Sequence, residues 1–265
     1  MKRTSVTLKD VQAVYGGPEA DLWELVMGEQ IHAGGMMSSL ALAKSAGIAS
    51  GMRGVDLCCC LGAGMRLLAH TYGVRMCGVD ATERMVEEAR RRTEAAGLSD
   101  NLEYRLGDVT DAPVKDGEFD FVWGEDAWCY VVDKDRLIRE AARVLKPGGI
   151  VAFTDWIEGP RGLSDDEAAR INTFMKFPDM QSLDGWAALL EKHGFQVKES
   201  VEIDFAVFVD LYMQMLTTQL TSDALRILGN DQALFEAMGA EMEFMRQAAH
   251  AGKITRGRFV GVKKG

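Results

Sequence analysis

From Gly54 onward, short apolar runs alternate with stretches whose apolar residues recur at helical spacing. This alternation is typical of βαβ units, in which parallel strands form a sheet that helices cover on both faces. We therefore predict an α/β fold with a mostly parallel, seven-stranded sheet. The apolar runs place the strands at Gly54–Cys59, Arg75–Val79, Leu102–Leu106, Phe119–Trp123, Ile150–Thr154, Val197–Ile203 and Phe259–Val262.

The length of 265 residues is sufficient for one such domain with its own core. Helical patterns occupy residues 1–50 and residues 205–253, the second segment separating the last two strands. The second segment is rich in Met and Phe, which suits an adaptable pocket wall or a helical hairpin packed on the sheet. We predict a single domain over residues 1–265, with a helical cap at 1–50, a ligand-binding core at 54–155 and a helical lid insertion at 205–253.

The charge balance and the apolar pattern of the sequence disfavour several kinds of partner. The chain has 30 basic and 40 acidic residues and a net charge of −10, which disfavours nucleic acid as a partner. No apolar stretch approaches the roughly 18 residues of a membrane span, so we expect no membrane partner. The basic run Arg90–Arg92 is predicted to be a solvated helix face.

The cysteines indicate a reduced protein. Three of the five are consecutive, Cys58–Cys60, and their spacing fits neither a disulfide framework nor a zinc site. We therefore expect free thiols, no metal and a cytoplasmic location.

Acidic residues follow the ends of the first four predicted strands: Asp56, Asp80, Asp108 and the pair Glu125–Asp126. The carboxyl ends of parallel strands meet at one edge of a sheet, where ligands bind. The position of Asp80 suits the two hydroxyls of a ribose, and Asp108 is placed to accept a hydrogen bond from an adenine amino group. Each carboxylate alone is more often a helix cap or a solvated turn. Their occurrence at four strand ends favours an adenosine-containing cofactor.

These residues resemble the motifs of the class I S-adenosylmethionine-dependent methyltransferases, a family with a Rossmann-like sheet. Asp56 matches the acidic position of the family's first-strand motif, (D/E)xGxGxG. Asp80 and Asp108 match the acidic residues after the second and third strands, and Leu145–Gly149 matches the LKPGG turn before the fifth. The resemblance is strong over residues 54–155, the predicted cofactor-binding core.

The chain departs from the family pattern in the first-strand motif. Cys58 and Cys60 stand at the first two glycine positions, and only Gly62 is kept. We predict that both cysteines are structural substitutes for glycine and that their thiols do no chemistry. The resemblance implies S-adenosylmethionine as cofactor, bound by Asp56, Cys58, Cys60, Gly62, Asp80, Ala81, Met85, Asp108, Val109 and Glu125.

Two further segments are similar to the sarcosine/dimethylglycine N-methyltransferase group. Gly28–Gly34 resembles the "GEDIHIG" element of that group, and Phe121–Ala127 resembles its "VWSQDA" segment. The group places a histidine shortly after the "DA" pair, whereas residues 128–130 of this chain contain none. The acceptor of that group is therefore not transferred to this chain.

Three kinds of side chain are candidates for acceptor chemistry. His32 and Asp126 are candidate catalytic residues, because either is placed to assist the loss of a proton from an amine. His32, Trp128 and Tyr130 are candidate substrate contacts, and the two aromatic rings are suited to face a cation. The alternatives are local capping or packing for His32 and burial in the core for the aromatic residues.

We therefore predict methyl transfer from S-adenosylmethionine to a small-molecule acceptor, most favourably an amine. Two alternatives stay open. One is an O- or C-methyltransferase for an apolar natural-product or isoprenoid-like acceptor, and the other is a non-catalytic cofactor-binding module. A homo-oligomer is compatible with the sequence.

Overall fold

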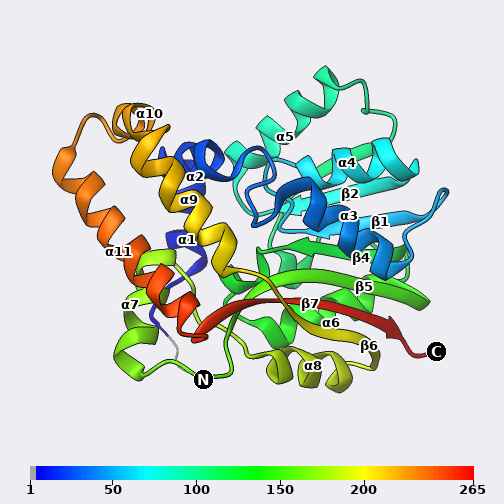
Figure 1. The fold of residues 1–265 in the computed structure, drawn as a ribbon. Helices are drawn as coiled ribbons and strands as arrows, with labels where there is room; N and C mark the ends of the chain where they lie inside the picture. Colours follow the sequence, from blue (N-terminus) through cyan, green and yellow to red (C-terminus); the bar gives the residue numbers. More distant parts are fainter. Residues whose placement is uncertain (1–3) are drawn as a thin grey trace.

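The computed structural model describes residues 4–265. Its centre is one seven-stranded sheet with the strand order β3-β2-β1-β4-β5-β7-β6 (Figure 1). Neighbouring strands from β3 to β5 are parallel, whereas β7 runs antiparallel to both β5 and β6. The predicted α/β fold with a mostly parallel sheet is confirmed. The strands are β1 (Arg53–Leu57), β2 (Arg75–Asp80), β3 (Leu102–Leu106), β4 (Phe119–Glu125), β5 (Leu145–Glu158), β6 (Phe195–Ile203) and β7 (Ile254–Lys263).

Helices surround the sheet in the described part of the chain. The α-helices are α1 (Leu8–Gly16), α2 (Glu19–Met27), α3 (Gly35–Ala46), α4 (Ala63–Tyr72), α5 (Glu83–Ala95), α6 (Lys134–Val144), α7 (Asp165–Met175), α8 (Leu183–Lys192), α9 (Ala206–Thr218), α10 (Thr221–Ile227) and α11 (Gln232–His250). Two short 3-10 helices, η1 (Val109–Asp111) and η2 (Trp128–Tyr130), follow β3 and β4.

Helices cover both faces of the sheet, and each helix packs its apolar residues against the strands. On one face α3, α4 and α5 pack through residues such as Leu42, Leu68 and Val86. On the other face α6 and α8 pack through residues such as Leu137 and Trp186. These side chains are almost completely buried, and burial of each contributes about 1.5–3 kcal/mol. The two layers hold the strand ends, and the loops that follow them, in place.

A third group of helices stands beyond the carboxyl ends of the parallel strands. Figure 1 shows α1, α2 and α7 beside α9, α10 and α11 at this end of the sheet. One apolar cluster joins them, and it includes Trp23 of α2, Ile171 of α7, Val209 of α9 and Met245 of α11. Helices are thus present in both segments where the sequence predicts them. Their roles as cap and lid, and the single-domain division, stay predictions.

Strand β5 is longer than the predicted run Ile150–Thr154. It continues to Glu158, because residues 155–158 pair with residues 254–257 at the start of β7. At its other end the β4–β5 register shifts, so that residues 146–149 form an irregular extra segment. The polar residues in these extensions hide the strand pattern in the sequence, and only the antiparallel pairing reveals it.

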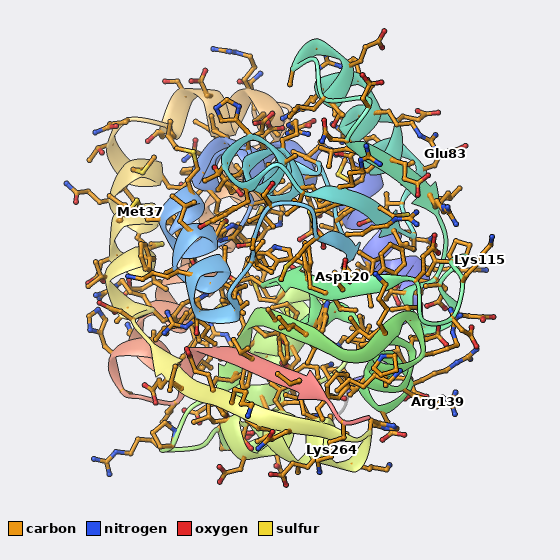
Figure 2. The ribbon with its side chains drawn as sticks, turned by 90° about the vertical axis from the view of Figure 1, so that its right-hand side faces the viewer. Met37, Glu83, Lys115, Asp120, Arg139 and Lys264 are labelled. Atoms are coloured by element: carbon orange, nitrogen blue, oxygen red, sulfur yellow. The ribbon has the colours of Figure 1, made fainter. Side chains whose placement is uncertain are left out.

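Figure 2 shows the molecule from the side, with Met37 of α3 at the surface. The Met37 side chain is 75% exposed. Among residues 4–265, none of the helices combines the length and the apolar character that crossing a bilayer requires.

The first residue of α6, Lys134, forms a buried ion pair with Asp179. Its Nζ lies 3.1 Å from Asp179 Oδ1, and both side chains are at most 3% exposed. The same Nζ donates hydrogen bonds to the carbonyl oxygens of Cys129 and Val131, at 3.2 and 2.9 Å. Lys134 therefore joins the turn after β4 to the segment that precedes α8.

Lys134→Met is expected to lower the free energy of unfolding by about 3–5 kcal/mol, because it leaves the buried Asp179 carboxylate without this cation. Urea unfolding followed by circular dichroism measures the change. The matched control is Lys192→Met, which removes an exposed lysine paired with Asp135 and is expected to cost about 0–1 kcal/mol. Equal effects of the two substitutions would contradict the prediction.

Candidate active site

A cavity lies at the carboxyl ends of β1 to β4, the edge where a parallel sheet binds its ligands. The turn around His32 and helix α1 form its opposite wall. Gly62, Met85 and Trp128 stand outside the lining. The predicted site residues that line it are His32, Asp56, Cys58, Cys60, Asp80, Ala81, Asp108, Val109, Glu125, Asp126 and Tyr130.

Asp80 connects the loops that follow β1 and β2. Its Oδ2 accepts a hydrogen bond from the Cys60 N–H, and its Oδ1 accepts one from the Thr82 N–H, both at 2.9 Å. Burial raises the pKa of Asp80, and these hydrogen bonds oppose the rise. Because each carboxylate oxygen has two acceptor sites, Asp80 keeps acceptor capacity for a ligand in the cavity.

Asp56 of β1 and Glu125 of β4 bring two more carboxylates to the same cavity. Burial raises the pKa of Asp56 well above its usual range, and the charges of Glu125 and Asp80 raise it further. A Cβ atom at Gly64 would lie 2.4 Å from Glu125 Oε2, so glycine there leaves room for the carboxylate in its present position. A cationic ligand would relieve the repulsion among these groups.

The loop after β1 adopts the conformation of a glycine loop although it contains cysteines. Cys58 has φ +74° and Cys60 has φ +46°, in the left-handed region that costs a side-chain-bearing residue roughly 1–2 kcal/mol. At Gly62, by contrast, a Cβ would lie 2.4 Å from the Tyr104 hydroxyl. Glycine at position 62 therefore allows close packing of Tyr104 against the loop, and its predicted contact with the cofactor stays a prediction.

The surroundings of this loop disfavour the reactive thiolate forms of Cys58 and Cys60. Burial raises the pKa of both Cys58 and Cys60, and the Asp80 charge adds to the rise, so the thiolate forms are disfavoured. Cys60 Sγ lies 3.5 Å from Met85 Sδ, so Met85 supports the loop from behind. All five cysteines are free. Within residues 4–265, no three or more His, Cys, Asp or Glu side chains form a group able to hold a metal.

The loops after β3 and β2 complete this side of the cavity. Asp108 caps η1, with Oδ1 accepting hydrogen bonds from the Thr110 N–H at 2.8 Å and from its hydroxyl at 2.9 Å. The Ala81 carbonyl oxygen accepts a hydrogen bond from Gln12 Nε2 at 2.7 Å. Gln12 lies in α1, so this helix is tied to the loop that follows Asp80. The sequence contains no signal that would have identified Gln12.

His32 is buried between the cavity and its own turn. Its Nε2 lies 3.3 Å from Glu125 Oε1, 3.3 Å from Gln30 Oε1 and 3.2 Å from Ser39 Oγ. Its Nδ1 lies 3.3 Å from the Ala33 carbonyl oxygen. His32 is therefore packed locally, as one of the alternatives predicted. It also lines the cavity, where a ligand could reach it.

Asp126 is held by donors on both carboxylate oxygens. The Arg256 Nε lies 2.9 Å from each oxygen, and Oδ2 also accepts the Ala33 N–H at 3.0 Å. Arg256 is 1% exposed and donates further hydrogen bonds to Ser38 Oγ and Thr154 Oγ1. This geometry suits a positioning role better than proton abstraction. Sequence reasoning missed Arg256, whose only signal is a charge next to an apolar run.

The two aromatic candidates have different surroundings. Trp128 is fully buried, donates from Nε1 to the Leu57 carbonyl oxygen at 3.0 Å and stacks on Phe153 with ring centroids 4.2 Å apart. The expected substrate contact of Trp128 is therefore not met, because the side chain belongs to the core. Tyr130 lines the cavity and meets Tyr15 of α1 edge to face, with centroids 5.5 Å apart.

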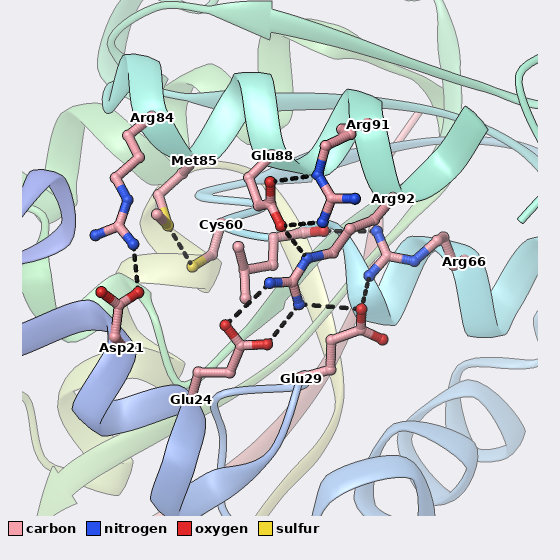
Figure 3. A network of polar contacts seen from close by, with 11 residues as sticks. Asp21, Glu24, Glu29, Cys60, Arg66, Arg84, Met85, Glu88, Arg91 and Arg92 are labelled. Atoms are coloured by element: carbon pink, nitrogen blue, oxygen red, sulfur yellow. Dashed lines mark hydrogen bonds and ion pairs between the residues drawn. The ribbon is translucent and has the colours of Figure 1, made fainter. Parts of the chain in front are cut away.

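Ion pairs hold the N-terminal segment against α5 (Figure 3). Arg92 contacts Glu24 of α2 at 2.5 Å and Glu29 at 3.1 Å, and Arg84 pairs with Asp21. The Arg92 side chain is only 18% exposed. The prediction of a solvated basic run is therefore wrong for Arg92, because tertiary contacts with α2 cover it.

The cavity thus presents carboxylate acceptors at four neighbouring strand ends, beside a loop in a glycine-type conformation. These acceptors fit the hydroxyl and amino groups and the positive charge of S-adenosylmethionine. Residues 55–153 match a family model described as a methyltransferase domain. This segment is a methyltransferase domain.

Two curated relatives of the methyltransferase domain are similar to this chain. The methyltransferase GfsG of Streptomyces halstedii is 30% identical over 160 residues, which cover 59% of this chain and 57% of that protein. A sarcosine/dimethylglycine N-methyltransferase of Halorhodospira halochloris is 37% identical over 94 residues, which cover 36% of this chain and 34% of that protein. The matches thus span between about a third and three-fifths of the length of these relatives.

A solved structure has the same fold. The phosphoethanolamine N-methyltransferase 2 of Haemonchus contortus matches with a TM-score of 0.82 at 22% identity, over 97% of this chain and 59% of that chain. The predicted resemblance to class I S-adenosylmethionine-dependent methyltransferases, including the sarcosine/dimethylglycine group, is confirmed for the methyltransferase domain.

Asp80→Ala is expected to weaken S-adenosylmethionine binding by roughly 1.5–3 kcal/mol, because the variant loses a charged hydrogen-bond acceptor facing the cavity. Isothermal titration calorimetry measures the dissociation constant. Asp116→Ala, which removes an 81% exposed carboxylate, is the control and should leave binding unchanged. A folded Asp80→Ala variant with wild-type affinity would refute a role for Asp80 in cofactor binding.

Cys60→Ala is expected to keep turnover within a few-fold of the wild type, because the thiol is half-buried and its thiolate form is disfavoured. Release of S-adenosylhomocysteine measures turnover once an acceptor is known. If the variant binds the cofactor normally but transfers no methyl group, the thiol has a chemical role and the prediction is wrong.

Proposed function

We propose that this protein transfers a methyl group from S-adenosylmethionine to the nitrogen of a small amine. The observation that carries the proposal is the arrangement at one end of the cavity. His32 and Glu125 are in contact there, and Tyr15 and Tyr130 line the same cavity. Carboxylates and aromatic rings together favour an amine that carries or develops positive charge.

The charge of the cavity supports a cationic acceptor. Several of its lining residues are Asp or Glu, and among residues 4–265 none of the lining residues is Lys or Arg. Burial raises the pKa of both Tyr15 and Tyr130, so both remain neutral phenols. Each ring that faces a methylated ammonium group would contribute roughly 0.5–2 kcal/mol.

When bound, S-adenosylmethionine supplies an activated methyl group on a positively charged sulfur. The residues of this chain must then align the amine, exclude water and accept a proton. We infer that His32 accepts the proton, with Glu125 at 3.3 Å stabilising the resulting charge. Asp126, held by Arg256, orients the turn on which His32 lies through the Ala33 N–H.

A second candidate function is O- or C-methylation of an apolar acceptor. It is favoured by apolar side chains in the cavity lining, among them Leu8, Val11, Val131 and Val132. A non-catalytic cofactor-binding module is the third reading, motivated by the cysteine-containing loop after β1. We propose a cytoplasmic location because all five cysteines are free thiols. A homo-oligomer stays a prediction.

Tyr130→Ala is expected to lower kcat/KM for an amine roughly ten-fold or more, because it removes a ring that faces the developing charge. The dissociation constant of S-adenosylmethionine should change little. Tyr130→Phe, which keeps the ring and loses the hydroxyl, is the matched variant and should retain most of the activity.

The acceptor class is measured by S-adenosylhomocysteine release over a panel of small amines, phenols and isoprenoid-like alcohols. Turnover of amines supports the proposal. Turnover of hydroxyl or carbon acceptors alone would replace it with the second candidate. Binding of S-adenosylmethionine without turnover on any acceptor would favour the non-catalytic module.

A further inference from the structure

Asp155 is a buried carboxylate that the proposed chemistry does not use. It lies in β5 opposite Gly257 of β7, and its side chain is inaccessible to solvent. Its Oδ1 accepts a hydrogen bond from the Cys129 N–H at 3.0 Å. Its Oδ2 is buried without a hydrogen-bond partner among residues 4–265. An unpartnered buried carboxylate oxygen destabilises a fold, so this group requires an explanation other than stability.

The Cys129 N–H belongs to the turn that carries two cavity residues. Asp126, with φ +52°, begins this turn and Tyr130 ends it. The Asp126 N–H donates to the Thr154 carbonyl oxygen at 2.8 Å. Two consecutive residues of β5, Thr154 and Asp155, therefore hold the two parts of the turn. Loss of the second contact would remove the hydrogen bond from β5 to the part that carries Tyr130, which Lys134 would then hold only through the Cys129 and Val131 carbonyl oxygens.

We propose that Asp155 is a positioning residue for methyl transfer, which places Tyr130 at the acceptor end of the cavity by holding the Cys129 N–H. This proposal rests on the proposed function. Asp155 does not line the cavity, so its effect passes through the turn rather than through contact with the acceptor.

The groups that face Asp155 make its charge sensitive to pH. Burial raises the pKa of Asp155 to about 7, with Lys134 of α6 opposing the rise and Asp126 adding to it. Cys129 and Cys58 also face this carboxyl, and the pKa of each thiol is raised well above its usual range, mainly by burial. The ionised carboxylate makes the stronger, charge-assisted bond to the Cys129 N–H. Transfer is therefore expected to accelerate as the pH rises through about 7.

Folding stability should change in the opposite direction. The pKa of Asp155 is about 7 in the folded protein, well above its ordinary value of 3.8, so the folded state retains a proton that the unfolded chain has released. Stability from this group is complete at low pH and is lost as the pH rises between these two values. Asp155→Asn keeps the shape and removes the charge. At pH 8 we expect this variant to melt no lower than the wild type.

The experiment compares Asp155→Asn with Asp120→Asn. Asp120 lies in β4 near the end remote from the cavity and likewise accepts a backbone hydrogen bond, from the Arg53 N–H at 2.8 Å (Figure 2). Asp155→Asn is expected to lower kcat roughly ten-fold while cofactor affinity stays within a few-fold. The rise in rate near pH 7 should disappear in this variant and persist in Asp120→Asn.

Wild-type kcat in Asp155→Asn, or a persistent rise near pH 7, would overturn the proposal. A fall in kcat that is accompanied by a clear loss of melting temperature would also overturn it, because that result indicates a purely structural role. If the wild type methylates no amine, the proposed function fails by itself. Amide hydrogen exchange then decides the positioning role, since weaker protection of Cys129 in Asp155→Asn supports it and unchanged protection refutes it.

If Asp155→Asn does not fold, the proposal is tested by amide hydrogen exchange of the wild type. Protection of the Cys129 amide is followed between pH 6 and 8 against that of the Arg53 amide, which Asp120 holds. Protection of Cys129 that increases relative to Arg53 through pH 7 supports the proposal. A constant ratio of the two would overturn it.

Discussion

The ion pair between Arg256 and Asp126 joins parts of the chain that the sequence keeps far apart. Arg256 lies in β7, and its guanidinium holds Asp126 after β4, Thr154 of β5 and Ser38 of α3. Asp126 in turn accepts the N–H of Ala33, next to His32. Both charges are nearly inaccessible to solvent, so either one alone would be strongly destabilising. The antiparallel return of β7 therefore determines the position of the His32 turn.

The cavity gathers carboxylates at a cost in stability. Asp56 and Asp80 both have pKa values raised by burial, and Asp155 behind the turn remains partly unpartnered. Groups of this kind are typical of functional sites, because a well-packed apolar core would fold more favourably. A positively charged cofactor and a cationic acceptor would each reduce the repulsion. Partly buried ion pairs, such as Arg92 with Glu24, hold the N-terminal helices against α5.

Residues at strand ends were predictable, and residues that act across elements were not. Asp80 lines the cavity, as its position at the end of β2 predicts. In βαβ units the carboxyl ends of the parallel strands meet at one edge of the sheet, so neighbours in the sequence suffice to place this residue there. Trp128 and Tyr130 are two residues apart and have opposite surroundings, because one 3-10 turn directs the first into the core and the second into the cavity. Such a turn has no recognisable periodicity. The covering of Arg92 by α2 depends on a contact between segments 68 residues apart.

The sequence by itself determined a mostly parallel, seven-stranded sheet and the carboxylates at the ends of its first four strands. These features follow from apolar periodicity and from residues adjacent in the chain. Only the tertiary structure decided that Arg256 neutralises Asp126, that Tyr15 meets Tyr130, and that Asp155 accepts the Cys129 N–H in the turn that carries Tyr130. These contacts join distant segments, and their energies depend on burial, which a local pattern of residue types does not specify.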